Sequence, residues 1–131
     1  MKKILIDTNI YSKAMRGEKS SIQIFRQYET LLISPVVIGE LLAGFKRGKL
    51  EEKNRKQLKE FLNRERVQSL FISKETSEFY SFILNNLKTK GTPIPINDIW
   101  IGASAMEHGA GLATVDNHFE NIEGVIIVKP E

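Results

Sequence analysis

Cysteine is absent from this chain of 131 residues. Its absence excludes disulfide bonds, thiolate metal ligands and a cysteine nucleophile. Long apolar runs are missing as well, because no stretch approaches the roughly 20 residues of a membrane-spanning helix. The apolar run from Ile4 to Ile6 is too short for a signal peptide. We therefore expect a soluble, cytoplasmic protein with no membrane partner.

The sequence also lacks internal repeats, low-complexity tracts and linkers rich in proline or glycine. Its length fits one domain over residues 1–131. A chain of this size can bury a core without disulfides or structural metals. The net charge of +3 is small and does not by itself indicate a nucleic-acid partner.

Basic residues are unevenly distributed along the chain. Nine of the 19 lie between positions 46 and 66, where only four acids accompany them. This segment is either a surface that grips phosphates or an ordinary solvated helix with i,i+4 ion pairs. Both interpretations stay open at the level of sequence.

Short apolar segments alternate with amphipathic ones. The pattern predicts strands at residues 3–6, 31–33, 69–72, 112–115 and 125–128. It predicts helices at about 9–16, 20–28, 35–48, 50–64 and 97–107, and one more between Ser73 and the loop at 91–95. Short apolar strands separated by helices predict an α/β fold, a three-layer α/β/α sandwich with a central parallel sheet of four to five strands.

Four acidic residues stand out against this pattern. Binding sites in parallel sheets form beyond the carboxyl ends of the strands. Of the only three aspartates, Asp7 and Asp116 follow predicted strands, and Asp98 begins the helix before the fourth strand. Glu40 lies in the almost wholly apolar segment 36–42. A buried carboxylate without a partner is costly, and a cation is one of the few groups that offset its charge.

Each acid also has an ordinary explanation. Asp7 and Asp98 could cap helices. Asp116 could form a turn with Asn117, and Glu40 could pair with a lysine or arginine. Four carboxylates at one edge of a sheet are better explained by a shared site.

The chemistry of such a site follows from its oxygen ligands. Mg²⁺ and Mn²⁺ prefer carboxylates and water, and clustered carboxylates repel one another until a cation enters. A bound ion would orient a phosphodiester, lower the pKa of a bound water and stabilise the developing charge. No histidine base is required, so His108 and His118 are interpreted as structural or surface residues.

Four segments together resemble the PIN-domain family, and in particular its VapC-type toxin ribonucleases. They are residues 5–10 (LIDTNI), 34–41 (SPVVIGEL), 95–103 (PINDIWIGA) and 112–119 (LATVDNHF), in matching order and spacing across nearly the whole chain. The resemblance implies a Mg²⁺- or Mn²⁺-dependent endoribonuclease that is the toxin of a toxin–antitoxin pair. It also implies an RNA substrate, an antitoxin that blocks the toxin, and a homodimer.

The resemblance assigns roles to individual residues. Carried over by motif, the catalytic and metal-binding quartet is Asp7, Glu40, Asp98 and Asp116. We expect Asp7 and Asp98 to bind the metal directly and Asp116 to bind it or position a water. Glu40 is expected to bind a second ion or to orient the attacking water. Residues expected to hold the acids by hydrogen bonds are Thr8, Asn9 and Thr114.

One residue departs from the family pattern. Trp100 stands where many relatives carry a smaller apolar residue, so it either packs in the core or shapes the groove.

Three alternative functions remain to be weighed. A PIN-like scaffold that binds RNA or protein without cutting is the main alternative, but no acid is missing. A phosphorylated receiver domain would need an aspartate at the end of the third predicted strand, where Ser73 follows instead. An aspartate-nucleophile phosphatase would need an acid at position 9, which is Asn9.

Overall fold

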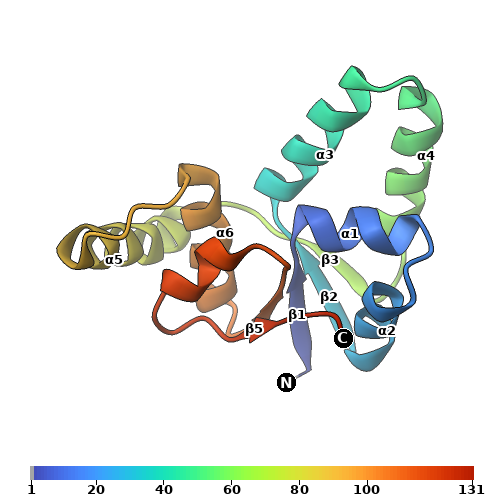
Figure 1. Ribbon diagram of the computed structural model, residues 1–131. Helices are drawn as coiled ribbons and strands as arrows, with labels where there is room; N and C mark the ends of the chain where they lie inside the picture. Colours follow the sequence, from blue (N-terminus) through green and yellow to red (C-terminus); the bar gives the residue numbers. More distant parts are fainter. Residues whose placement is uncertain (1) are drawn as a thin grey trace.

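The computed structural model describes residues 2–131 as a three-layer α/β/α sandwich (Figure 1). The elements are β1 (Lys3–Ile6), α1 (Thr8–Met15), α2 (Lys19–Gln27), β2 (Thr30–Ile33), α3 (Pro35–Arg47), α4 (Glu51–Leu62), β3 (Val67–Ser69), α5 (Lys74–Lys90), α6 (Ile96–Glu107), β4 (Gly111–Ala113), the 3₁₀ helix η1 (Asn117–Asn121) and β5 (Ile127–Val128). The predicted fold class is confirmed. None of the described helices is long and apolar enough to cross a membrane.

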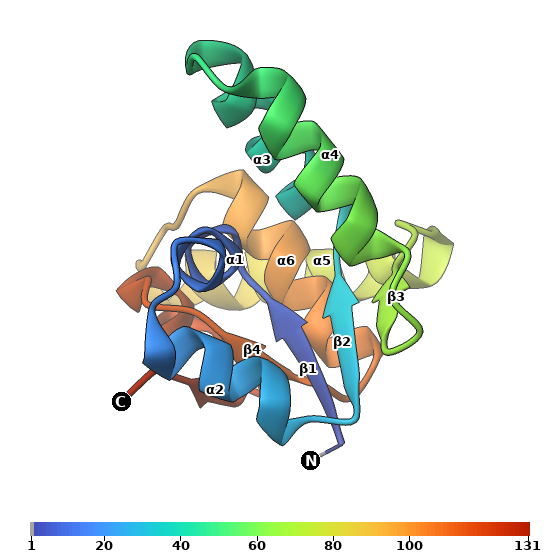
Figure 2. The same ribbon diagram turned by 90° about the vertical axis from the view of Figure 1, so that its right-hand side faces the viewer.

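The sheet has five parallel strands in the order β3-β2-β1-β4-β5. Central strand β1 pairs with β2 and β4, and Leu5 lies opposite both Leu32 and Leu112. Helices α1 and α2 cover one face of the sheet, while α6 covers the other with α5 packed outside it (Figure 2). Because β1 is covered on both faces, its apolar residues are fully buried. Because β1 and β4 pair in parallel, their carboxyl ends lie side by side.

Two edge strands and the inner strand β4, predicted at 112–115 but found at Gly111–Ala113, differ from the sequence prediction. The third was predicted at 69–72 but lies at Val67–Ser69, and the fifth was predicted at 125–128 but contains only Ile127 and Val128. The apolar run continues beyond the last ladder bond of β3, in which the Leu70 amide donates to the Ile33 carbonyl at 2.9 Å. Phe71 beyond it is 83% exposed. An edge strand has only one partner, so hydrophobicity alone does not mark its end.

Helix α4 is polar along most of its length and is anchored by one aromatic side chain. The Phe61 ring lies 5.1 Å from Tyr11 of α1 and 5.6 Å from Phe25 of α2, measured between ring centroids. All three side chains are buried. This cluster holds α4 against the helices that follow β1.

We expect Phe61→Ala to lower the free energy of unfolding by about 3–5 kcal/mol, because it removes a buried ring and leaves a cavity. Urea denaturation followed by circular dichroism measures the change. Glu60→Ala, at the neighbouring exposed position, is the control and should change stability by less than about 0.5 kcal/mol. A loss below about 1 kcal/mol in Phe61→Ala would mean that α4 is held in another way.

Helix α6 is fixed to α5 at both polar and apolar contacts. The Thr76 hydroxyl donates to Glu107 Oε1 at 2.6 Å. Trp100 is half-buried and stacks on Tyr80 with centroids 4.1 Å apart. This contact assigns Trp100 a packing role between the two helices. The fixed helix carries Asp98 in its first turn.

Candidate metal centre

Asp7 follows β1 and caps α1. Its Oδ1 accepts the Thr8 amide at 2.8 Å, and its Oδ2 accepts the Thr114 hydroxyl at 2.6 Å and the Asn9 side-chain amide at 3.2 Å. The residue is only 5% exposed. Three uncharged donors therefore fix the carboxylate while leaving its negative charge in place.

Thr114 links Asp7 to Asp116. Its buried hydroxyl donates to Asp7 and accepts the Asp116 amide at 2.9 Å. Asn9 makes a second link, since its Oδ1 accepts the Val115 amide at 3.3 Å. The chain segments that follow β1 and β4 are thus joined by side chains that the sequence placed near the acids.

Glu40 reaches the same edge of the sheet from α3. Its Oε1 accepts the Thr8 hydroxyl at 2.6 Å, and its Oε2 accepts the Asn97 side-chain amide at 3.3 Å. Within residues 2–131, no lysine or arginine forms an ion pair with Glu40. Sequence reasoning did not single out Asn97, although its position next to Asp98 was a usable signal.

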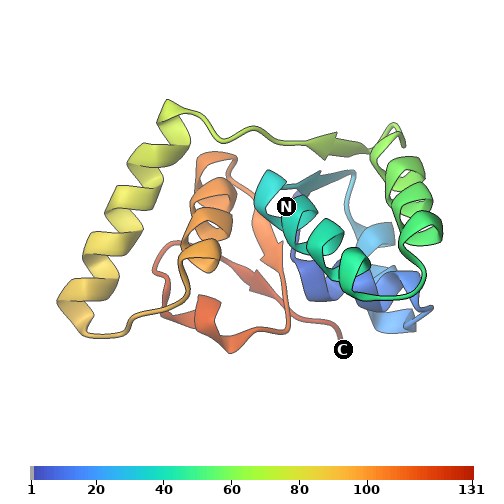
Figure 3. The same cartoon turned by 90° about the horizontal axis from the view of Figure 1, so that it is seen from above.

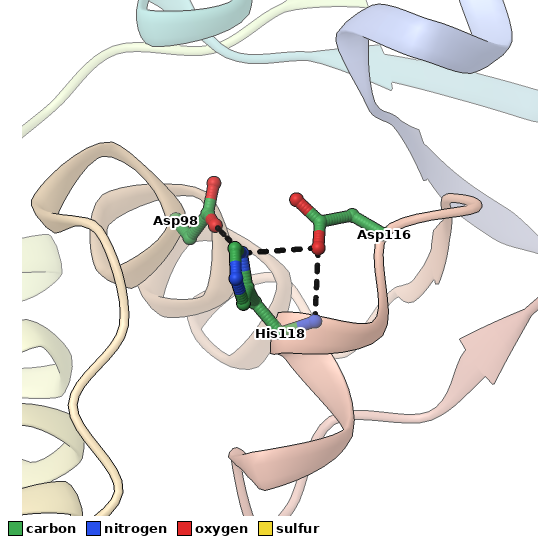
Figure 4. A group of neighbouring side chains, drawn as sticks. All are labelled: Asp98, Asp116 and His118. Atoms are coloured by element: carbon green, nitrogen blue, oxygen red, sulfur yellow. Dashed lines mark hydrogen bonds and ion pairs between the residues drawn. The ribbon is translucent and has the colours of Figure 1, made fainter.

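Asp98, Asp116 and His118 form a separate cluster (Figure 4). His118 Nδ1 lies 3.2 Å from Asp98 Oδ2 and 3.1 Å from Asp116 Oδ1. One ligand atom from each residue lies within 4.8 Å of the other two. In the described part of the chain, no other set of three or more acid, histidine or cysteine side chains is gathered this closely.

The interpretation of His118 as a structural or surface residue was incomplete. Its side chain is 52% exposed, yet its ring lies against both carboxylates. Asp116 caps η1 by accepting the His118 amide at 2.9 Å, and this turn brings the ring back towards the acids. The Asp-x-His spacing at the end of a strand was the signal that could have found it.

Comparison with known proteins identifies the family. Residues 4–125 match the family model of the PIN domain. The chain belongs to the PIN-domain family. Ribonuclease VapC1 of Rickettsia felis is 35% identical over 130 residues, covering 95% of this chain and 94% of that protein. Ribonuclease VapC4 of Mycobacterium tuberculosis is 27% identical, covering 98% and 97%.

Solved structures agree with this family. The PIN domain is similar to a chain in the crystal structure of VapBC2 from Rickettsia felis bound to a DNA fragment from its promoter. The TM-score is 0.84 at 26% identity, covering 98% of this chain and 99% of that one. A chain of DNA-bound VapBC from Salmonella typhimurium gives a TM-score of 0.87 at 24% identity, with 98% of both chains covered. The second likeness supports the fold alone.

The acids of this PIN domain act on one another electrostatically. Burial, followed by the negative charge of Asp116, raises the pKa of Asp98 to about 6, and the His118 contact opposes the rise. Burial also raises the pKa of Asp7, with hydrogen bonds from Thr114 and Thr8 opposing it and the charges of Glu40 and Asp116 adding to it. A divalent cation would offset both the cost of burying these charged groups and the repulsion between them. Carboxylate oxygens with one imidazole nitrogen are a donor set that fits such an ion.

Metal binding by this PIN domain should weaken as the pH falls through about 6, the pKa of Asp98, because the ion must then displace a proton. Below that pH we expect the Mn²⁺ affinity to fall by up to about tenfold per pH unit. Isothermal titration calorimetry at pH 5.0, 6.0 and 7.5 measures the affinity. Equal affinities at pH 5.0 and 7.5 would exclude Asp98 as a ligand.

Proposed function

We propose that this chain is a Mg²⁺- or Mn²⁺-dependent endoribonuclease, the toxin of a toxin–antitoxin pair. One observation carries the proposal: four carboxylates face one edge of the sheet, and within the described residues none is paired with lysine or arginine. An acidic site without a lysine or arginine partner favours a divalent cation. The names of the VapC ribonucleases among the relatives add the substrate class.

The proposed mechanism divides the work among the four acids. When bound, the ion supplies a water of lowered pKa and positive charge against the phosphate oxygens. Asp98 and Asp116, whose side chains lie close together, would hold the ion, and Asp7, expected from the family pattern to bind it as well, would present a fixed carboxylate from the end of β1. Glu40, oriented by Thr8 and Asn97, would align a water for attack on the phosphodiester.

The α3–α4 hairpin supports RNA as the substrate. The hairpin rises above the carboxyl ends of β1 and β2 (Figure 2). Its helix α4 lies at the opposite end of the molecule from α5 (Figure 3). Its exposed basic residues are Lys46, Arg47, Lys49, Lys53, Arg55, Lys56 and Lys59. Lys46 and Arg55 pair with Glu51, and Arg66 donates to the Phe25 carbonyl at 2.9 Å. The hairpin is proposed to hold phosphates beyond the cleavage point.

Two protein partners belong to the same proposal. The solved relatives include VapBC complexes, and a groove between α3 and α4 offers a site for an antitoxin segment. Apolar residues such as Ile38 and Leu58 line this groove together with Arg55 and Lys59, which favours a segment with apolar and acidic side chains. Exposed Phe82, beside Phe79 and Met106, is a candidate surface for the homodimer.

The direct test incubates the purified chain with total cellular RNA in Mg²⁺, in Mn²⁺ and in EDTA. We expect discrete cleavage products with either metal and none in EDTA. Sequencing of the product ends would identify the RNA class. Binding of RNA without cleavage, by folded protein free of any partner and with both metals, would instead favour the silent PIN-like binding module.

A further inference from the structure

His118 occupies a position beside the acids that hydrogen bonding alone explains poorly. A single Nδ1 atom lies at nearly equal distances, 3.2 and 3.1 Å, from oxygens of Asp98 and Asp116. A neutral imidazole nitrogen that carries a proton can direct it fully at only one acceptor. The nitrogen therefore hydrogen-bonds to Asp98 and also lies close to Asp116, to which the same proton cannot be fully directed.

The same distances suit three ligands of one ion. Two atoms on adjacent corners of an octahedron with bonds of about 2.1 Å lie about 3.0 Å apart. The two nitrogen–oxygen separations are close to this edge length, and all three ligand atoms lie within 4.8 Å of one another. A shared ion would require the side chains to adjust so that the three atoms point at a common centre.

The burial of Asp98 provides a second indication. The residue is only 8% exposed, yet among the described residues its carboxylate has only the contact with His118. Asp7, which is similarly buried, accepts three hydrogen bonds. A buried carboxylate with so few donors leaves charge for a cation to balance.

We infer that His118 is a nitrogen ligand of the ion held by Asp98 and Asp116, and that it makes this centre select Mn²⁺ and similar transition metals over Mg²⁺. Imidazole binds first-row transition metals well, whereas Mg²⁺ prefers oxygen ligands and retained water. The inference rests on the proposed metal-dependent function and deepens it, because it names the class of ion. Asp7 and Glu40, tied to each other through Thr8, remain beside this ion as oxygen groups.

Mn²⁺ bound to protein stripped with EDTA provides the test, because pulsed electron paramagnetic resonance detects a directly bound nitrogen as ¹⁴N modulation. The affinities of Mn²⁺ and Mg²⁺ are measured in parallel by calorimetry. The test variant is His118→Gln, which removes the imidazole nitrogen but keeps a polar side chain with a carbonyl oxygen. The matched control is His108→Gln, which removes the other histidine, on the C-terminal side of α6.

We expect ¹⁴N modulation in the unchanged protein and in His108→Gln, and its loss in His118→Gln. The Mn²⁺ affinity of His118→Gln should fall by about 10- to 100-fold, while its Mg²⁺ affinity changes less than about threefold. Circular dichroism should show an unchanged fold, since the His118 side chain is 52% exposed.

Mn²⁺ bound without ¹⁴N modulation in the unchanged protein, or an unchanged preference for Mn²⁺ over Mg²⁺ in His118→Gln, would overturn the inference and leave the nuclease proposal standing. Such a result would make His118 a hydrogen-bonding group that positions the two carboxylates. Mn²⁺ bound with ¹⁴N modulation but without RNA cleavage would support His118 as a ligand and refute the nuclease. Failure to bind either ion would overturn both proposals.

Discussion

Asp7→Asn should reduce the rate of RNA cleavage by about 10³-fold or more, which corresponds to a loss of roughly 4 kcal/mol of transition-state stabilisation. The substitution removes one negative charge from the centre. It also places an amide NH₂ or a weaker acceptor against the donors Thr8, Asn9 and Thr114, which all point at the carboxylate. Initial rates on a labelled RNA with Mn²⁺ and with Mg²⁺ measure the effect.

Glu29→Gln provides the matched control for this substitution. It makes the same chemical change at an exposed residue before β2, at the amino-terminal edge of the sheet and away from the acids. Its rate should equal that of the unchanged protein. Cleavage by folded Asp7→Asn within tenfold of the unchanged rate would show that Asp7 is not part of the catalytic centre.

Asp98→Asn should separate stability from function, because it stabilises the metal-free protein while removing its response to metal. Burial and the charge of Asp116 raise the pKa of Asp98 from 3.8 to about 6. Because the pKa is raised in the folded state, the protonated carboxyl stabilises the fold at pH values below its ordinary pKa. This stability is lost as the pH rises through about 6. At pH 7.5 the charged carboxylate therefore destabilises the metal-free fold, and asparagine should restore about 1–2 kcal/mol.

Thermal denaturation in EDTA measures the gain, which should be an increase in Tm of roughly 3–8 °C at pH 7.5. At pH 4, where Asp98 is largely protonated, the advantage of the variant should nearly vanish. Added Mn²⁺ should raise the Tm of the unchanged protein, as expected for a ligand that binds only the folded state, but not that of the variant. A variant with no gain at pH 7.5, or one that Mn²⁺ still stabilises, would contradict the assignment of Asp98.

The predicted helices end within two residues of those in the structure, because capping and periodicity act locally. Ser34 caps α3 by accepting the Val36 amide at 3.1 Å, and Pro35 begins the helix, as the local pattern indicates. The edge strands were less predictable. Their ends depend on where a neighbouring strand stops offering hydrogen bonds, as β3 shows at Leu70.

The sequence by itself determined the fold class and the candidate acids. Apolar strands separated by helices require a covered parallel sheet, and Asp7 and Asp116 follow strands whose carboxyl ends must lie at one edge. It could not determine the strand order, which places β4 rather than β3 beside β1. That order alone brings the Thr114 hydroxyl to Asp7, across a separation of 107 residues.

Only the tertiary structure decided which side chains of the site contact one another. Glu40 meets Asn97 across 57 residues, and His118 meets Asp98 across 20. Neither contact has a local sequence pattern, because each depends on how α3, α6 and η1 pack around the sheet edge. Local preferences select which side chains stand at the ends of elements, but the packing of those elements selects which of them meet.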